Sequence, residues 1–155
     1  MGIRQLFIES SSELKEYLRK KGGRLIQTQQ ECPDVYEVIE SDNYCIGIIG
    51  NSFGIRPILL TDNQNRVFTS IGTKVFVFDE EKIIFSVDTG YSAILDIMLN
   101  NGILLIVSEL EVIKIDTNTW DIIWKKDYSC IMDYSVKGNF LELVDDNGTH
   151  TLDLN

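Results

Sequence analysis

Carboxylates and one histidine are the residues of this chain whose types and spacing could support acid–base chemistry. Acidic residues stand in close pairs at Glu80-Glu81, Glu109/Glu111 and Asp145-Asp146. Two facing carboxylates are what a glycoside hydrolase uses. Nothing in the spacing selects one pair, and all three fall at expected turns or strand edges, where solvated acids belong. The pairs therefore do not define an active site.

Hydrolysis through an imidazole would need His150, the only histidine. It lies in Thr149-His150-Thr151-Leu152, a strand-like alternation, and the repeat described below aligns it with the apolar Ile113. This pattern favours a packed or half-buried structural histidine. The sequence holds no Gly-x-Ser-x-Gly, His-Glu-x-x-His or phosphate-binding loop. We expect a protein that is not an enzyme and uses no cofactor and no metal.

The polar turn that begins at Thr61 has the Asp and Asn content of a calcium-binding loop. The spacing of its residues does not match such a loop. Counted from Asp62, a calcium loop needs glycine at its sixth position and glutamate at its twelfth. Val67 and Thr73 stand there. We therefore expect an ordinary turn.

Three cysteines, Cys32, Cys45 and Cys130, give information on redox environment. Their number is odd and no Cys-x-x-Cys spacing occurs, which argues against a zinc site or a disulfide framework. Unpaired cysteines favour a reducing, cytoplasmic location. We expect all three to act as small apolar residues within strands.

A repeat of 37 residues organises the second half of the chain. Asp79, Asp116 and Asp153 are 37 residues apart, and the segment YSAILD at 91–96 recurs as YSCIMD at 128–133. Sliding 91–116 onto 128–153 without gaps gives 7 identities in 26 positions. A fixed period of this size is typical of stacked supersecondary units, each too small to bury its own apolar face.

The repeated unit resembles a blade of a β-propeller of the pyrroloquinoline-quinone-dehydrogenase-like or WD type. The stretch IDTNTWDIIW at 115–124 has a strand ending in Asp, a turn and a Trp-bearing strand, with Trp120 where the family usually has Gly. The resemblance covers about 66–155 and implies antiparallel blades of short strands, without implying the quinone. Closed propellers need about 4–8 blades. We therefore expect an open or incomplete propeller, a curved sheet or a sandwich.

Local signals predict a mainly β chain with one N-terminal helix. Ser10 and Glu13 have capping-box spacing and Gly22-Gly23 supplies a stop, which predicts a helix over 11–21. Short alternating segments predict β structure beyond residue 24. The expected strands are 2–9, 24–30, 35–40, 44–49, 55–60, 67–71, 74–79, 82–87, 92–98, 103–108, 111–116, 121–126, 130–136, 139–144 and 149–154. We expect one domain over 1–155, with an N-terminal segment (1–23), a degenerate first β unit (24–65) and the repeats (66–155).

The distribution of net charge along the chain indicates which class of partner it would bind. The net charge is −10, with +3 in residues 1–30 and −13 in residues 31–155. An acidic body repels nucleic-acid phosphates and anionic membranes and attracts a basic protein. No apolar run reaches the roughly 18 residues that would span a bilayer. The residues that we expect to contact a partner are Trp120, Glu109, Glu111, Asp145 and Asp146.

Two classes of function remain open. The first is a protein-binding module, similar in acidity and size to the bacterial immunity proteins that neutralise nuclease toxins. The second is a structural or scaffold protein of propeller type, which completes a larger complex or forms a homo-oligomer by pairing edge strands. Salt discriminates the two, because association driven by charge slows as ionic strength rises.

Overall fold

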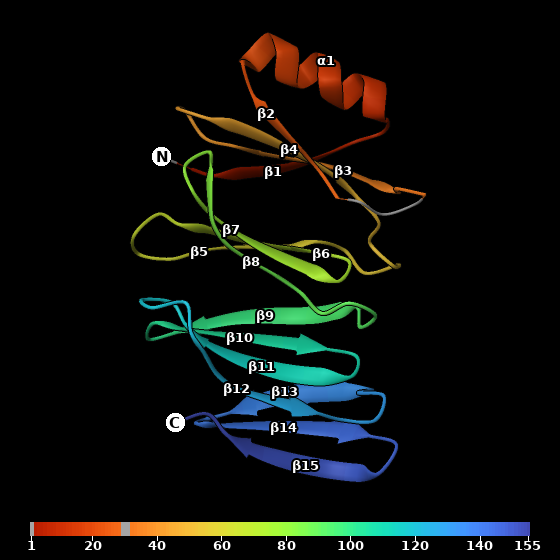
Figure 1. Ribbon diagram of the computed structural model, residues 1–155, viewed down its shortest axis with the longest axis vertical. Coiled ribbons are helices and arrows are strands. Elements are labelled where there is room, and N and C mark those ends of the chain that lie inside the picture. Colours follow the sequence, from red (N-terminus) through yellow and green to blue (C-terminus); the bar gives the residue numbers. More distant parts are fainter. Residues whose placement is uncertain (1, 29–31) are drawn as a thin grey trace. The chain divides into compact units, whose positions relative to one another are not determined.

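The computed structural model describes residues 2–28 and 32–155 of the chain (Figure 1). Within these residues most of the structure is β-strand and one α-helix lies near the N-terminus, so the predicted fold class is confirmed. The strands form four small sheets, each open with a strand at either edge. The chain divides into two compact units, residues 1–88 and 89–155. The single domain expected over 1–155 stays a prediction, since compactness alone does not show how the units fold.

The N-terminal unit holds two sheets. The first has the strand order β1-β3-β4-β2 and the second the order β5-β6-β7-β8. Their elements are β1 (Arg4–Ile8), α1 (Ser11–Lys21), β2 (Arg24–Gln27), β3 (Val35–Glu40), β4 (Cys45–Gly50), β5 (Ile58–Thr61), β6 (Val67–Ile71), β7 (Lys74–Asp79) and β8 (Lys82–Asp88). The second sheet is an antiparallel meander, whereas β2 of the first sheet pairs in parallel with β4.

Helix α1 has the predicted ends and covers one face of the first sheet. The Ser10 hydroxyl accepts from the backbone N–H of Glu13 at 3.2 Å, and Gly22 ends the helix with φ 68°. Leu14 and Leu18 are buried among side chains of β3 and β4. The helix approaches the sheet closely at Gly47, where a Cβ would lie 2.5 Å from Leu18 Cδ1. Any larger residue at position 47 would push the helix outward.

The opposite face of the first sheet packs on the second sheet. The residues of this core are Val35, Ile39, Ile46, Ile48, Val67, Ile71, Phe76 and Phe78. Glu37 and Thr69 occupy the same faces of β3 and β6 as these apolar residues, because side chains two apart in a strand point the same way. Both are fully buried. A carboxylate therefore lies inside an otherwise apolar layer.

The C-terminal unit holds the remaining two sheets, both antiparallel meanders. Their strands are β9 (Ile94–Asn100), β10 (Ile103–Ser108), β11 (Glu111–Asp116), β12 (Ile122–Asp127), β13 (Asp133–Lys137), β14 (Phe140–Asp145) and β15 (Gly148–Asp153). Strands β9 to β12 form one sheet and β13 to β15 the other. A core between the two sheets contains Leu105, Val107, Val112, Leu141, Leu143 and Leu152. Across this layer the Tyr134 hydroxyl donates to Asp96 at 3.0 Å.

The predicted period of 37 residues is present in the strands. Strands β7, β11 and β15 begin at residues 74, 111 and 148, and β10 and β14 begin at 103 and 140. Each step is 37 residues. The hairpin of β3 and β4 also matches, because β4 and β8 begin at 45 and 82. The first sheet is therefore a modified copy of the repeat, in which α1 and the parallel strand β2 are added.

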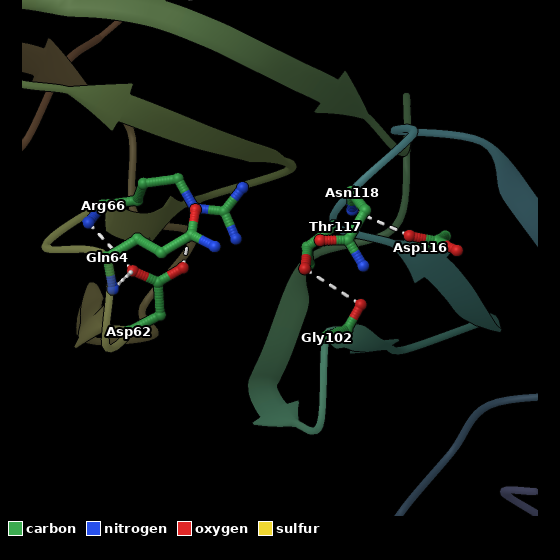
Figure 2. Close-up of polar contacts among 7 residues, drawn as sticks. All are labelled: Asp62, Gln64, Arg66, Gly102, Asp116, Thr117 and Asn118. Carbon is green, nitrogen blue, oxygen red and sulfur yellow. Dashed lines mark hydrogen bonds and ion pairs between the residues drawn. The ribbon is translucent and has the colours of Figure 1, made fainter.

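Two turns are held by carboxylates that accept hydrogen bonds within the same turn (Figure 2). Asp62 accepts from the backbone N–H of Gln64 at 2.9 Å and from Arg66 Nε at 2.7 Å, so its carboxylate closes its own turn. Asp116 likewise accepts from the N–H of Asn118 at 2.7 Å. Both carboxylates act as turn acceptors, as Asp commonly does.

Several local expectations need correction. Strand β2 ends at Gln27, and part of the predicted 24–30 strand lies outside the described residues. Strand β5 begins at Ile58, after Pro57, because proline cannot donate to a ladder. Strand β13 begins at Asp133 rather than at residue 130. Only Cys45 is buried in a strand, whereas Cys32 and Cys130 are exposed and lie outside strands. All three thiols are free.

Candidate functional site

Four of the five predicted contact residues lie at one end of the C-terminal unit. Glu109 is in the turn between β10 and β11, and Glu111 begins β11. Asp145 ends β14, and Asp146 follows it in the turn to β15. Trp120 follows the other end of β11. A six-residue strand is roughly 20 Å long, so Trp120 does not belong with the four acids.

Backbone hydrogen bonds tie three segments together at this end. Ala93 O accepts from the N–H of Glu109 at 3.0 Å, Glu109 O accepts from the N–H of Ile131 at 2.6 Å, and Leu110 O accepts from the N–H of Tyr128 at 2.8 Å. The β10–β11 turn is thus clamped between the connections that precede β9 and β13. These loops hold their side chains on a framework with fixed geometry.

At this end of the C-terminal unit, equivalent positions of two successive repeats carry serine. Ser92 Oγ lies 2.6 Å from Ser108 Oγ, and Asp145 Oδ2 accepts from the N–H of Ser129 at 3.1 Å. Ser129 is 37 residues after Ser92 and Asp145 is 37 after Ser108. The second copy therefore replaces a hydroxyl by a carboxylate in the same structural position.

Asp145 is a structural acid and not a surface contact. It is 3 % exposed and also accepts from the N–H of Asn147 at 2.8 Å and lies 2.8 Å from His150 Nε2. Burial alone would raise the pKa of Asp145, but the bonds from His150 and from the two amides hold that pKa below its usual value. His150 is half-buried, with its ring against Tyr128. The predicted half-buried position of His150 is confirmed.

Glu111 is also buried, at 6 % exposure. Its Oε2 pairs with Lys125 Nζ at 2.9 Å, and its Oε1 has no hydrogen-bond partner among the described residues. The hydrogen bond that Lys125 donates to Glu111 raises the pKa of Lys125. The expectation that these acids are solvated is therefore wrong for Glu111 and Asp145. Glu109 is half-buried and Asp146 exposed, so both remain accessible.

Trp120 is half-buried rather than exposed on its turn. Its φ is 63°, in the left-handed region that favours glycine. This explains why a glycine is usual at that position in the propeller family that the repeat resembles. Trp124, in β12, packs against the core of the C-terminal unit, as predicted.

Sequence reasoning missed three apolar side chains beside the accessible acids. Tyr91 is 99 % exposed, Met132 62 % and Leu110 44 %. Tyr91 adjoins Ser92, whose hydroxyl accepts from the N–H of Leu110 at 2.9 Å, and Met132 follows Ile131. We call Tyr91, Glu109, Leu110, Met132 and Asp146 the acidic end. The repeated YS dipeptide gave no signal for this difference, because its first copy exposes Tyr91 while its second copy half-buries Tyr128.

The charge of the chain is concentrated in the unit that carries the acidic end. Residues 89–155 hold four Lys/Arg and 11 Asp/Glu, a net charge of −7, whereas residues 1–88 carry −3. An accessible apolar group with an acidic rim is the composition of a protein-contact surface.

The N-terminal unit has a polar cleft of about 560 Å³ beside the end of α1. Glu40 is its central acid, and it accepts from the Tyr17 hydroxyl at 2.7 Å and pairs with Arg4 and, at 4.0 Å, with Lys21. The Tyr17 hydrogen bond is the main cause that lowers the pKa of Glu40, and it raises the pKa of Tyr17 to about 12. The charge of Glu40 is therefore paired within the protein.

The described residues contain neither a cluster of metal ligands nor a membrane-spanning helix. Among them, no group of three His, Cys, Asp or Glu side chains is arranged to hold a metal ion. In the same part of the chain, no helix has both the length and the apolar character to cross a bilayer.

No protein-family model matches the sequence, and no curated protein matches it. Among solved structures, the computationally designed Ika4 protein is similar, with a TM-score of 0.52 at 13% identity over 84% of this chain and 90% of that protein. Hsv2 of Kluyveromyces lactis gives a TM-score of 0.40 at 12% identity, covering 64% of this chain and 34% of Hsv2. Hsv2 of Kluyvelomyces marxianus gives 0.41 at 9% identity, covering 63% and 35%.

The chain thus spans about a third of the length of the Hsv2 structures that it matches. At these identities the similarity to Ika4 concerns the fold alone. It agrees with the all-β, propeller-like character of the four sheets. The resemblance to propeller blades holds at the level of fold, and the function has to be argued from the side chains.

Proposed function

We propose that this chain is a protein-binding module that engages a basic protein through the acidic end. The observation that carries the proposal is the exposed Tyr91, almost fully in solvent, on loops clamped by backbone hydrogen bonds and next to accessible acids. Tyrosine is a frequent anchor of protein interfaces because it buries a large rigid area and keeps a polar tip. Glu109 and Asp146 belong to the same end of the unit, where they bond to Ala93 and Ser129, and they would attract a cationic surface.

An inhibitor of the immunity type is the finer form of this proposal. Such a protein covers a basic active surface of its target, and the net charge of −7 on the C-terminal unit is suited to that task. Charge complementarity would speed the encounter, and the apolar residues Tyr91, Leu110 and Met132 would slow dissociation.

A scaffold that assembles through sheet edges is the second candidate. Edge strand β12 exposes Ile122 and Ile123, which are 52 % and 48 % exposed. Exposed β-branched residues at an edge favour pairing with another strand. Lys125 and Lys126 on the same strand oppose it, because charges on an edge protect against pairing. This balance makes assembly the weaker candidate.

The test is capture of basic proteins from native lysate on the immobilised chain, compared between two matched variants. Tyr91→Ser combined with Glu109→Gln and Asp146→Asn alters the acidic end. Asp121→Asn combined with Asp153→Asn removes the same charge at the opposite end of the unit, where both residues are exposed. We expect a basic protein that is retained by the wild type and the control pair, lost by the triple variant, and weakened at high salt.

Two results would contradict the proposal. One is a retained protein that the triple variant binds as well as the wild type does. The other is retention of further copies of this chain alone, at both salt concentrations, which would favour edge assembly. In the second case, Ile122→Lys should abolish self-association while the triple variant leaves it unchanged.

A further inference from the structure

The C-terminal unit contains a cleft of about 620 Å³ away from the acidic end. It opens between the two sheets of the unit, where the β9–β10 turn and the β13–β14 turn meet the C-terminal residues. Its apolar lining consists of Met98, Leu99, Ile103, Leu105, Val136 and Leu154. Small-molecule sites typically have volumes of about 300–1,000 Å³ and an apolar lining with few polar groups. The cleft has the size and lining of such a site.

Lys114 is the single charged residue of the cleft lining, which otherwise adds four asparagines. Its side chain comes from β11 and lies opposite Leu105 of β10 and Trp124 of β12 in the sheet register. It occupies the same face as the core residue Val112. Lys114 is only 5 % exposed, so its ammonium group is largely withdrawn from water.

The ammonium group has unused hydrogen-bonding capacity. Lys114 Nζ donates to the carbonyl oxygen of Leu154 at 2.9 Å, and among the described residues this is its one hydrogen bond or ion pair. An ammonium group has three donors. Burying a charge without a counter-charge is unfavourable, and such groups are normally paired. The counter-charge that the Lys114 ammonium group lacks would be an anion, and an anionic ligand could reach it through the cleft.

The repeat shows that this lysine is specific to one sheet. Residue 77, which precedes Lys114 by 37, is the fully buried Val77, and residue 151, which follows by 37, is Thr151. The architecture therefore does not require a cation at this position. Of these three equivalent positions, the one beside the cleft carries the charged side chain.

We propose that this cleft binds a small apolar monocarboxylate, with its carboxylate on Lys114 and its hydrocarbon part against Met98, Ile103 and Val136. One buried cation suits a single negative charge. The absence of acidic residues from the lining is unusual for a unit of net charge −7, and it keeps the local field favourable for an anion. The site goes beyond the proposed protein contact and shares none of its residues.

Binding of dodecanoate, compared with dodecanol, tests the site by titration calorimetry on the full chain below micellar concentrations. The two probes have the same apolar chain and differ in charge. We expect dodecanoate to bind at least about tenfold more tightly than dodecanol, which corresponds to about 1.4 kcal/mol. Acetate, which carries the charge without the chain, should bind more weakly than either.

Variants separate a ligand role of Lys114 from a structural one. Lys114→Met should remove the preference for dodecanoate and leave dodecanol unchanged, whereas Lys114→Arg should retain the preference. Val136→Asp introduces a carboxylate at a lining position that is 46 % exposed, and should weaken dodecanoate about tenfold. Ile122→Asp makes the same change on an exposed strand residue outside the cleft and should have no effect.

The proposal is overturned if dodecanoate does not bind, or if it binds no better than dodecanol. It is also overturned if Val136→Asp and Ile122→Asp behave alike. This last comparison stands even if Lys114→Met fails to fold, because neither residue 136 nor residue 122 is part of a buried core. Loss of this site would leave the proposed protein contact untouched, since the triple variant of the acidic end tests that separately.

Discussion

Glu37 in the N-terminal unit and Lys114 in the C-terminal unit are both buried in the layer between two sheets, and their surroundings differ in opposite ways. Glu37 of the N-terminal unit is fully buried and accepts from Gln5 Nε2 at 2.7 Å and from Thr69 Oγ1 at 3.2 Å. Lys114 of the C-terminal unit is buried to a similar degree, has one acceptor and lines a cleft. The protein itself supplies hydrogen-bond donors to the Glu37 carboxylate. The Lys114 ammonium group keeps donors that a ligand could use.

This difference indicates separate roles for Glu37 and Lys114. A buried carboxylate with neutral donors reduces its energy by taking up a proton, so Glu37 makes the N-terminal unit sensitive to pH. A buried ammonium group beside a cleft can instead be relieved by an anionic ligand. Glu37 therefore predicts a pH-dependent stability for the N-terminal unit, and Lys114 predicts that the C-terminal unit binds an anionic ligand.

The largest expected effect is the pH dependence that Glu37 gives to stability. Burial raises the pKa of Glu37 to about 7, although the hydrogen bonds from Gln5 and Thr69 partly lower it. The unfolded chain titrates near 4.5. Between these values the folded chain holds a proton that the unfolded chain has released, so stability falls as pH rises through 4.5 to 7. The loss is on the order of 3 kcal/mol.

Urea unfolding of the wild type and Glu37→Gln at pH 5 and pH 8 measures this effect. The amide cannot ionise, so the variant should lack the Glu37 contribution, and the difference between the two proteins cancels the other titrating groups. Glu40 and Asp145, whose pKa values are lowered, act below about pH 4.5 and in the opposite direction. Equal pH dependence in both proteins would show that Glu37 does not titrate in this window.

Both tryptophans, Trp120 and Trp124, lie in the C-terminal unit, which allows the units to be followed separately. Tryptophan fluorescence reports on that unit, and far-ultraviolet circular dichroism reports on both. The Glu37 effect should appear in the dichroism. If it appears equally in the fluorescence, the units unfold together, as the predicted single domain requires.

The fold was largely predictable because its signals are local and repeated. The capping residues fixed helix α1 at 11–21, and the 37-residue period placed β7, β10 and β11 at their observed bounds. The first sheet was less predictable. Its parallel pair of β2 with β4 depends on the helix between β1 and β2, and no local pattern specifies which strand the chain will join after a helix.

A second, smaller effect concerns the two donors around Glu37. Glu37→Leu at pH 5 leaves the buried Thr69 hydroxyl without its acceptor, and it leaves the Gln5 amide only its 3.4 Å hydrogen bond to the Pro57 carbonyl. An unsatisfied buried donor costs about 1–3 kcal/mol. We expect a loss of stability in this range by urea unfolding. Glu37→Gln keeps an oxygen that can accept both bonds, so it should lose less at the same pH. A leucine variant as stable as the wild type would mean that the donors find water or other acceptors.

The candidate site was less predictable than the fold, because exposure depends on tertiary contacts. Asp145 and Glu111 look like surface acids in the sequence, yet the segment 128–132 covers the first and Lys125 pairs with the second. Tyr91 looks like a core residue by analogy with Tyr128 and is exposed instead. Lys114 could have been found from the repeat alone, since it replaces the buried Val77 of the preceding copy.

The smallest expected effect is on stability when Lys114 is replaced, and it is the sharpest test of the contrast between the units. Lys114→Met removes a buried charge together with one hydrogen bond to the half-buried Leu154 carbonyl. Replacing a buried charge by an apolar side chain of similar shape is often neutral or stabilising. We expect a change within about 1 kcal/mol, measured by urea unfolding without ligand.

Lys126→Met is the matched control on neighbouring strand β12. Lys126 is exposed, and its ammonium group lies 5.0 Å from the centroid of the Trp124 ring, a contact worth about 0.5–1 kcal/mol at an exposed site, so this variant should also change little. A loss well above 1 kcal/mol for Lys114→Met alone would show that the ammonium group is needed to hold Leu154, and the two buried charges would then both be structural. Unchanged stability combined with a lost preference for dodecanoate would show the reverse. In that case Lys114 is kept in the apolar layer for a ligand, because the fold itself does not need it.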